Sequence, residues 1–419
     1  MSTTPHPSAI DADRFQPDRM AERIVRWSAV NSGSWNPDGL ARMVDTLAQA
    51  VAHDFGEAPQ RVDLPPLTRV LDTGETESVA TGPALVLRRR PEAPRRVLLG
   101  IHYDTVFGPE HPFQAVREHD GKLHGPGVVD AKGGIAVMLE ALRAFEASPF
   151  AERLGWTLFL NPDEEVGTLS SRPLLQELAS EHDFGLVFEP ALPDGSLVGA
   201  RKGSGNFDVV MRGVSAHAGR DFAQGRNAVA ALSTALATAA GITDPARGLT
   251  VNVARVSGGG ASNIVPDLAV GRLNVRMSDP ADAPDAVHQL RQAVASAADR
   301  FGCTSALHGR VTSPPKPNGP GLESLIEQTL AATRDLTGQT LAVHATGGVC
   351  DGNKLAAAGL PTLDTMGPVG GDLHSDREWL DRSSLAPRAH VAAEVLARYA
   401  QGLFDPPQRT PVIADAPNE

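Results

Sequence analysis

The chain has 419 residues, which is long enough for two domains or for one domain with a large insertion. Its 38 basic and 50 acidic residues give a formal net charge of −12, which argues against nucleic acid or an anionic membrane as the main partner. It has two cysteines, no basic start followed by an apolar stretch, and no run of about 18 apolar residues, so we expect a cytoplasmic protein.

Strand and helix signals alternate along the first half of the chain. Helical periodicity at residues 20–55, 133–147 and 171–182 is interleaved with strand-like runs at 95–101, 155–161 and 184–190. That alternation predicts an α/β fold with a mostly parallel sheet flanked by helices. The polar, proline-rich ends, up to residue 20 and from about residue 405, are expected to fray.

The pattern changes near Gly203 and returns after Pro314. Between them, four strand-like runs and two helical runs within about 110 residues predict a small α+β unit. We therefore expect a catalytic domain built from residues 1–203 and 315–419, with residues 204–314 inserted as a lid or dimerisation domain.

Acids and histidines follow four of the strand-like runs. His102 and Asp104 end the first run, Glu164 and Glu165 follow "WTLFL", and Glu189 follows "FGLVF". His374, in "DLHSD", comes after the run "LPTLDTMGP". Because ligands of open α/β sheets gather at the carboxyl ends of strands, we expect these side chains to meet at one edge.

A fifth group comes from the glycine-rich segment "HGPGVVDAKGG", which places Asp130 just before a helix start. Two histidines and three carboxylates exceed the needs of one tetrahedral zinc, and they fit two divalent ions that share a carboxylate. The predicted metal ligands are His102, Asp130, Glu165, Glu189 and His374. Glu164, beside a ligand, is left to act as a general base.

Each of these residues has an ordinary alternative explanation when it is taken alone. Adjacent acids such as Glu164 and Glu165 are usually a solvated loop, and His102 behind an apolar run is usually a core histidine. Asp130 could be a helix cap, and Glu189 a turn residue before proline. Together the alternatives require five coincidences at one sheet edge, which favours the metal site.

Eight motifs in order resemble the two-zinc exopeptidase and deacylase family, and they run from about residue 98 to 380: "HYDTV", "GPGVVDAKGG", "DEEVG", "FEP", "SAHAG", "SNIVP", "NVR" and "LHSD". That family includes glutamate carboxypeptidase, acetylornithine deacetylase, succinyl-diaminopimelate desuccinylase and aminoacylase. The chain looks most similar to the glutamate carboxypeptidase branch. Its segment "TGGVCDGN" departs from that branch, so the resemblance does not extend to a preference for C-terminal glutamate.

The resemblance implies a role for each matching residue. Asp130 would bridge the metals, with a cis peptide bond to Ala131, and Asp104 would orient the ring of His102. A hydroxide held between the metals would attack the amide, with Glu164 as general base. His217, delivered from a partner subunit, would polarise the scissile carbonyl.

The remaining implied groups concern the substrate and the cofactor. Asn263 and Arg276 would hold the free carboxylate of a peptide or an N-acyl amino acid. Zinc is the implied metal, although the mixed nitrogen and oxygen donors also suit Co²⁺ or Mn²⁺. Arg201 and Lys202 form either an anion contact or an exposed charged turn, and Cys350 is expected to be an inert buried thiol.

The sequence thus predicts a homodimeric carboxypeptidase-like metallohydrolase that pairs through residues 204–314. An N-acyl-amino-acid deacylase is the alternative within enzymes. A descendant that binds without catalysis is a third hypothesis, but such a chain would be expected to lose a ligand or the base, and all six positions are filled here.

Overall fold

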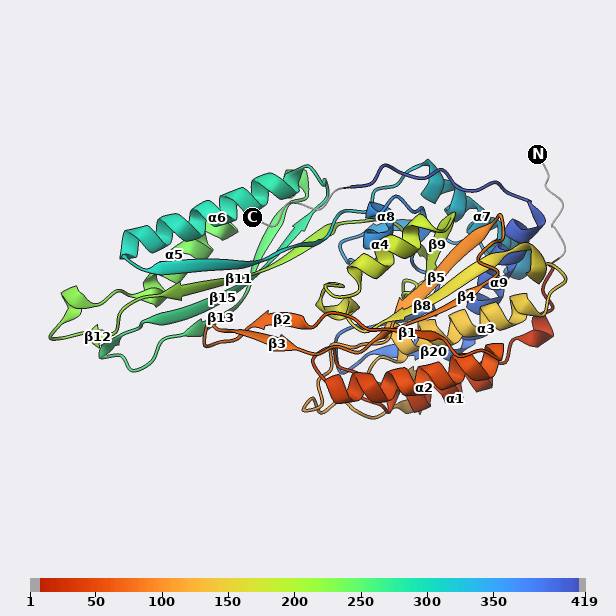
Figure 1. The fold of residues 1–419 in the computed structure, drawn as a ribbon, viewed down its shortest axis with the longest axis horizontal. Helices are drawn as coiled ribbons and strands as arrows, with labels where there is room; N and C mark the ends of the chain where they lie inside the picture. The colour runs from red at the N-terminus through yellow and green to blue at the C-terminus, as the bar shows by residue number, and fades with distance from the viewer. Residues whose placement is uncertain (1–7, 414–419) are drawn as a thin grey trace.

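The computed structural model describes residues 8–413, and Figure 1 shows two packed units joined along the chain. The larger unit is built on a six-stranded sheet with the order β1-β4-β8-β5-β9-β18. Its strands are β1 (Gln60–Val62), β4 (Ala84–Arg89), β5 (Arg96–His102), β8 (Gly155–Asn161), β9 (Phe184–Val187) and β18 (Thr362–Leu363). The four strands β8, β5, β9 and β18 run parallel, whereas β4 is antiparallel to both of its neighbours, β8 and β1.

Helices cover both faces of this sheet. They are α1 (Pro17–Ser28), α2 (Pro37–Phe55), α3 (Gly134–Glu146), α4 (Arg172–Ser180), α7 (Pro320–Thr337), α8 (Asp351–Ala357) and α9 (Leu385–Gln401). β8, the next strand of this sheet after β5 in the chain, lies on one side of β5, and β9, which follows β8, lies on the other side. Right-handed crossovers in opposite directions place α3 and α4 on opposite faces (Figure 1). This reversal beside β5 creates a crevice at the carboxyl ends of the strands.

The smaller unit is a four-stranded antiparallel sheet with the order β13-β15-β11-β16. Its elements are β11 (Gly203–Arg212), α5 (Ala228–Ala240), β13 (Thr250–Gly258), β15 (Leu268–Met277), α6 (Asp282–Phe301) and β16 (Thr304–Ser313). The buried side chains of this unit form a hydrophobic cluster separate from that of the larger unit. We propose domain boundaries near 203 and 314, where this sheet begins and ends.

Short strands complete the structure. β12 (Ala216–His217) pairs with β14 (Ile264–Val265) at the far end of the smaller unit, and β2 (Leu67–Val70) pairs with β3 (Thr76–Val79) as a hairpin. The others are β6 (Arg117–His119), β7 (Lys122–His124), β10 (Leu197–Arg201), β17 (Val343–Thr346), β19 (Gly370–Gly371) and β20 (Trp379–Asp381). No helix within residues 8–413 is long and apolar enough to cross a membrane.

The predicted alternation of strands and helices is confirmed, and three features differ from the prediction. The β2–β3 hairpin and α9 were not predicted; α9 is buried on most sides, so its apolar residues do not fall on a single stripe. The predicted fraying is wrong for residues 8–20 and 405–413: Phe15 is buried, and the Arg409 guanidinium donates to the carbonyls of Ala179 and His182. Residues 1–7 and 414–419 lie outside the described part of the chain.

Candidate metal centre

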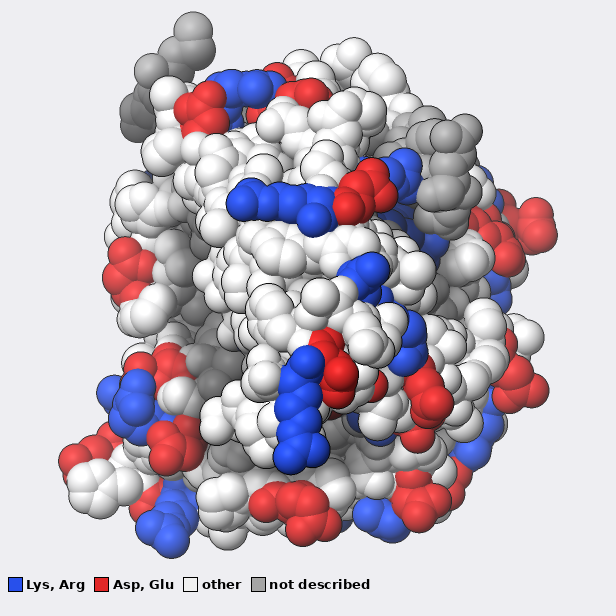
Figure 2. All heavy atoms as spheres, turned by 90° about the vertical axis from the view of Figure 1, so that its left-hand side faces the viewer, with Lys and Arg blue, Asp and Glu red and all other residues white. Residues whose placement is uncertain are grey.

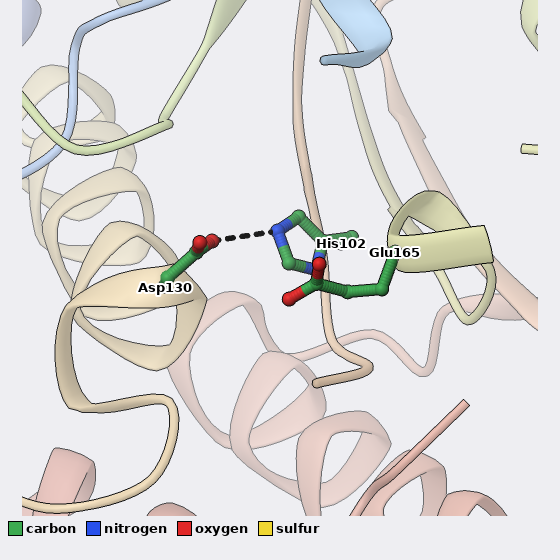
Figure 3. A group of neighbouring side chains, drawn as sticks. All are labelled: His102, Asp130 and Glu165. Atoms are coloured by element: carbon green, nitrogen blue, oxygen red, sulfur yellow. Dashed lines mark hydrogen bonds and ion pairs between the residues drawn. The ribbon is translucent and has the colours of Figure 1, made fainter. Parts of the chain in front are cut away.

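Three predicted ligands converge at the carboxyl edge of the parallel strands. His102 is the last residue of β5, Glu165 lies in the turn after β8, and Asp130 precedes α3. One donor atom from each lies within 4.8 Å of the others. Figure 3 shows the three side chains pointing toward one another from three different elements. Because the parallel strands end at the same edge of the sheet, the fold brings together residues that are far apart in the sequence.

The carboxylate of Asp130 faces two histidines, one with each oxygen. Its Oδ1 lies 3.0 Å from Nε2 of His102, and its Oδ2 lies 3.4 Å from Nε2 of His374. The same His374 nitrogen lies 3.2 Å from Oε2 of Glu165. His374 adopts a left-handed backbone conformation with φ of 60°, which is uncommon for a residue with a side chain. This geometry suits a carboxylate shared by two cations.

Glu189, at the end of β9, completes the group of predicted ligands. Its Oε1 lies 3.8 Å from Nε2 of His102, and it is a buried oxygen without a hydrogen-bond partner among the described residues. A buried carboxylate oxygen without a donor is costly unless a cation takes its place. The donor set and this unsatisfied oxygen therefore fit a pair of divalent ions.

The pKa values of these groups show the same shortage of positive charge. Burial raises the pKa of Glu189 well above its usual range, and burial together with the charge of Asp130 raises the pKa of Glu165. Burial would also raise the pKa of Asp130, but hydrogen bonds with His102 and His374 hold it below its usual value. Hydrogen bonds to Asp130 and Glu165 raise the pKa of His374 to about 11. Bound divalent ions would supply the missing positive charge, and the carboxylates of Asp130, Glu165 and Glu189 would then be stable in their charged form.

The loop that carries Asp130 is fixed from the far side by a carboxylate that the sequence analysis missed. Glu378 is 1% exposed, and it accepts hydrogen bonds from the backbone N–H groups of Gly127, Val129 and Asp130 at 3.0, 3.0 and 3.1 Å. The peptide bond between Asp130 and Ala131 is cis, as predicted. No local pattern of the sequence marks this role of Glu378.

Asp104 joins His102, the predicted metal ligand at the end of β5, to the acidic turn that follows β8. Its Oδ1 lies 3.2 Å from Nδ1 of His102 and accepts the Glu164 N–H at 3.2 Å. Its Oδ2 accepts the Glu165 N–H at 3.2 Å and the Ser34 hydroxyl at 2.6 Å. Both oxygens are thus saturated, and the ring of His102 is held with Nε2 toward the centre.

The three consecutive acids after β8 have three different environments. Asp163 points away from the centre and accepts the backbone N–H groups of Ser170 and Ser171 at 2.6 and 3.1 Å, so it stabilises the turn before α4. Glu165 faces the metal centre. Glu164 lies beside the cavity with 10% of its side chain exposed, 3.7 Å from the buried ammonium of Lys354. Burial raises the pKa of Glu164 to about 8, although the charge of Lys354 acts against this.

A cavity of about 410 Å³ opens beside the centre. Asp130, Glu164, Glu165, Glu189 and His374 all line it. Arg276, from β15 of the smaller unit, lines the same cavity, and it is a half-buried cation aimed at the site from across the two units.

Arg201 also lines this cavity, and of the two alternatives left open for it the exposed charged turn is wrong. Its side chain is 9% exposed, and its Nε lies 2.9 Å from Oδ2 of Asp364, which Nζ of Lys316 approaches to 2.6 Å. Burial would raise the pKa of Asp364, but the two cations lower it below its usual value. Lys202 donates instead to the carbonyl of Gly248, and Cys350 is buried, as expected.

Two predicted residues lie elsewhere in the chain. His217 and Asn263 are exposed neighbours at the far end of the smaller unit, where Ala218 N–H donates to the Asn263 carbonyl at 2.9 Å. Neither is among the described residues that line the cavity. Figure 2 views the molecule from this end, where the surface is largely uncharged with scattered acidic and basic side chains. Asn263 and Arg276 therefore cannot hold one carboxylate within a single chain in this arrangement.

A parallel sheet with clustered histidines and carboxylates at its carboxyl edge, next to a cavity, defines a metallohydrolase of the peptidase and amidohydrolase class. The chain belongs to peptidase family M20/M25/M40, whose model matches residues 98–398.

Relatives of known name agree with this assignment. The chain is 28% identical to carboxypeptidase G2 of Pseudomonas sp. (strain RS-16), over 91% of this chain and 88% of that protein. It is 30% identical to succinyl-diaminopimelate desuccinylase of Alkalilimnicola ehrlichii, over 78% of this chain and 88% of that protein. The fold matches an M20 family metallo-carboxypeptidase from Sulfolobus solfataricus with a TM-score of 0.73 and 15% identity, over 92% of this chain and 100% of the other.

Proposed function

We propose that this protein hydrolyses an amide bond next to a free carboxylate, as a carboxypeptidase does, with two divalent metal ions bound at the strand edge. The observation that carries the proposal is the carboxylate of Asp130, which is divided between His102 and His374 beside Glu164, a carboxylate that faces Lys354 and neither histidine. His102, Asp130 and Glu189 would hold one ion. Asp130, Glu165 and His374 would hold the other.

The metal pair would supply a Lewis acid for the substrate carbonyl and would lower the pKa of a bound water. Zinc is the proposed metal, and Co²⁺ or Mn²⁺ would suit the same donors. Glu164 would take a proton from the attacking water and return it to the leaving amine. Two contacts hold the Glu164 carboxylate at the cavity wall: the side chain faces the Lys354 ammonium, and the Glu164 backbone N–H donates to Asp104. Arg276 would pair with the free carboxylate of the substrate.

We propose further that the protein works as a homodimer through residues 204–314. β13 is an edge strand of the smaller sheet, and Val253 and Val256 on it are 36% and 56% exposed. An exposed edge strand with apolar side chains is suited to pairing with a second chain. A partner so placed would bring its His217 and Asn263 to the cavity, where His217 would polarise the carbonyl and Asn263 would join Arg276 on the carboxylate. A cytoplasmic location stays a prediction.

A deacylase that acts on N-acyl amino acids is the second candidate, since one relative is named a desuccinylase. Both candidates use the same centre, and they differ in whether the acyl side of the amide is an amino acid or a simple acid. Hydrolysis rates for dipeptides and for N-acyl amino acids with the same C-terminal residue distinguish them.

The metal requirement has a direct test. Purified protein should contain about two divalent ions per chain by elemental analysis, lose activity with a chelator and regain it with Zn²⁺, Co²⁺ or Mn²⁺. An amide that lacks the carboxylate should be a poor substrate. Full activity in metal-free protein, or equal rates with and without the carboxylate, would contradict the proposal.

A further inference from the structure

The smaller sheet has one face under helices and one face toward the catalytic unit. On β15, Leu273 and Val275 pack under α5 and α6, so Arg272, Asn274 and Arg276 point to the opposite face. Side chains two apart on a strand are about 7 Å apart along it. A polar row therefore runs from Arg276, at the catalytic cavity, to Arg272, some 13 Å away.

The β2–β3 hairpin sits at the far end of that row. Nη1 of Arg272 lies 2.7 Å from Oδ1 of Asp72 in the hairpin turn, and its Nη2 donates to the Val70 carbonyl at 2.9 Å. Val70 also packs against Val210 and Val270 of the sheet in a small cluster of its own. The hairpin, although part of the catalytic unit, is thus anchored on the inserted sheet, as Figure 1 shows.

A second cavity lies between the hairpin and the sheet. It measures about 620 Å³, and it adjoins the catalytic cavity because Glu165, Asn206 and Thr312 line both. Its apolar wall consists of Trp35, Pro65, Pro66, Leu67, Val166 and Leu169. A cavity that shares a proposed metal ligand with the catalytic cavity is within reach of a substrate bound at the centre.

The chemistry of this second cavity favours flat π systems. The indole of Trp35 is 37% exposed, and the Arg69 guanidinium lies 4.9 Å from its ring centroid. Glu77 fixes Arg69 through a 2.7 Å hydrogen bond to Nε. His308 and Arg310, from β16, line the cavity on the sheet side. Indole, imidazole and guanidinium surfaces all stack on aromatic rings.

We propose that this second cavity is the subsite for the acyl group of the substrate and that it selects a planar aromatic acyl group. The inference rests on the proposed function: the carboxylate lies at Arg276, the amide at the metal ligands, and the acyl group beyond Glu165. An acetyl group would leave the second cavity empty. The enzyme should therefore prefer a large aromatic acyl group to a small one.

The test compares kcat/KM for N-benzoyl, N-octanoyl and N-acetyl derivatives of the same amino acids, using the metal-loaded enzyme. The benzoyl-to-acetyl ratio should be about tenfold or more in the wild type. Trp35→Ala should reduce it by about tenfold, mainly through KM for the benzoyl substrate. Leu169→Trp, which fills the cavity, should reduce it by a similar factor. Leu403→Ala, a change at an exposed apolar residue beyond α9, should leave the ratio unchanged.

Two results would overturn the subsite while leaving the proposed function intact. The first is hydrolysis of all three substrates with a benzoyl-to-acetyl ratio near one that neither Trp35→Ala nor Leu169→Trp alters. The second is a higher kcat/KM for octanoyl than for benzoyl substrates, which would show an aliphatic site. Absence of hydrolysis of any N-acyl amino acid or dipeptide by metal-loaded wild type would instead contradict the proposed function itself. Circular dichroism spectra matching the wild type exclude misfolding of the variants.

Discussion

The metal centre and the far end of the inserted unit were both expected to carry functional histidines, yet the structure treats them differently. At the centre, His102 is 1% exposed and is held from two sides by Asp104 and Asp130. At the far end, His217 is exposed, and within residues 8–413 its ring accepts only the N–H of the nearby Gly219, at 3.1 Å. One site is assembled within the chain, whereas the other presents its side chain outward.

The difference shows which part of the reaction one chain can prepare alone. Parallel strands that end at one edge bring metal ligands together without help from another molecule. Under the proposed function, a second chain supplies the carbonyl-polarising group and part of the carboxylate site. Three predictions test this division, and a fourth tests the stability of the unit that carries the centre.

The largest effect is expected at the base. Glu164→Gln should lower kcat by about 10³- to 10⁴-fold, because the carboxylate that accepts the proton is lost. Metal content should stay at the wild-type level, since Glu164 is not a proposed ligand. The matched change Glu165→Gln should lower metal content as well. Near wild-type turnover by Glu164→Gln would exclude the assigned role.

The next effect tests whether the far end belongs to the active site. His217→Ala should lower kcat by about 10²- to 10³-fold if it stabilises the oxyanion. When Glu164→Gln and His217→Ala proteins are mixed, dissociated and reassembled, half of the dimers are mixed and each has one competent site, so activity should return to about a quarter of the wild-type value. No recovery would show that His217 does not act across subunits.

A smaller effect is expected behind the bridging carboxylate. Glu378→Gln replaces an acceptor of three N–H groups with an amide that offers only one oxygen, so the loop before Asp130 loses part of its support. Metal affinity, measured by competition with a chromophoric chelator, should fall about 10- to 100-fold. Unchanged affinity would mean that Glu378 stabilises only the fold.

The smallest effect concerns acid stability of the catalytic unit, at the opposite end of the strands from the centre. His182 is buried, and its two ring nitrogens contact the Leu178 carbonyl and the Thr157 hydroxyl at 2.7 and 2.8 Å. Burial lowers its pKa to about 4. The unfolded chain, with an ordinary pKa near 6.5, therefore binds the extra proton between pH 6.5 and 4, and stability falls on acidification by about 3 kcal/mol.

Urea denaturation across this pH range measures that loss, and His182→Gln serves as the comparison. The variant should be less stable at pH 7 because it fills the site less well, but its stability should fall less between pH 6.5 and 4. Parallel pH profiles for the two proteins would show that His182 is not the titrating group.

The sequence was sufficient to predict the convergence at the sheet edge, because position in a strand determines where a side chain lies. His102, Glu165 and Glu189 each follow a recognisable apolar run. Asp130 required the glycine pattern before it. By contrast, Glu378 and Lys354 act through contacts that depend on tertiary packing, and no local pattern marks a carboxylate that accepts distant N–H groups.

The hairpin was missed for a related reason. β2 has only four residues, and its apolar ends Leu67 and Val70 are separated by two polar residues, so the run lacks the alternation that would distinguish a strand from a loop. The hairpin packs on a sheet that lies more than 130 residues away in the sequence. Arg212, at the end of β11 in that sheet, donates a hydrogen bond to the Gly74 carbonyl of the hairpin turn. Anchoring of that kind is visible only when the chain has folded.

The contacts of Asp104 connect the predicted metal ligands with the predicted general base. The same carboxylate receives the amide hydrogens of Glu164 and Glu165 and orients the imidazole of His102. If His102 and Glu165 bind metal and Glu164 transfers the proton, as proposed, substitutions around Asp104 that change the metal preference should also change the rate of proton transfer. Substitutions meant to change substrate preference are therefore better made in the walls of the two cavities than around Asp104.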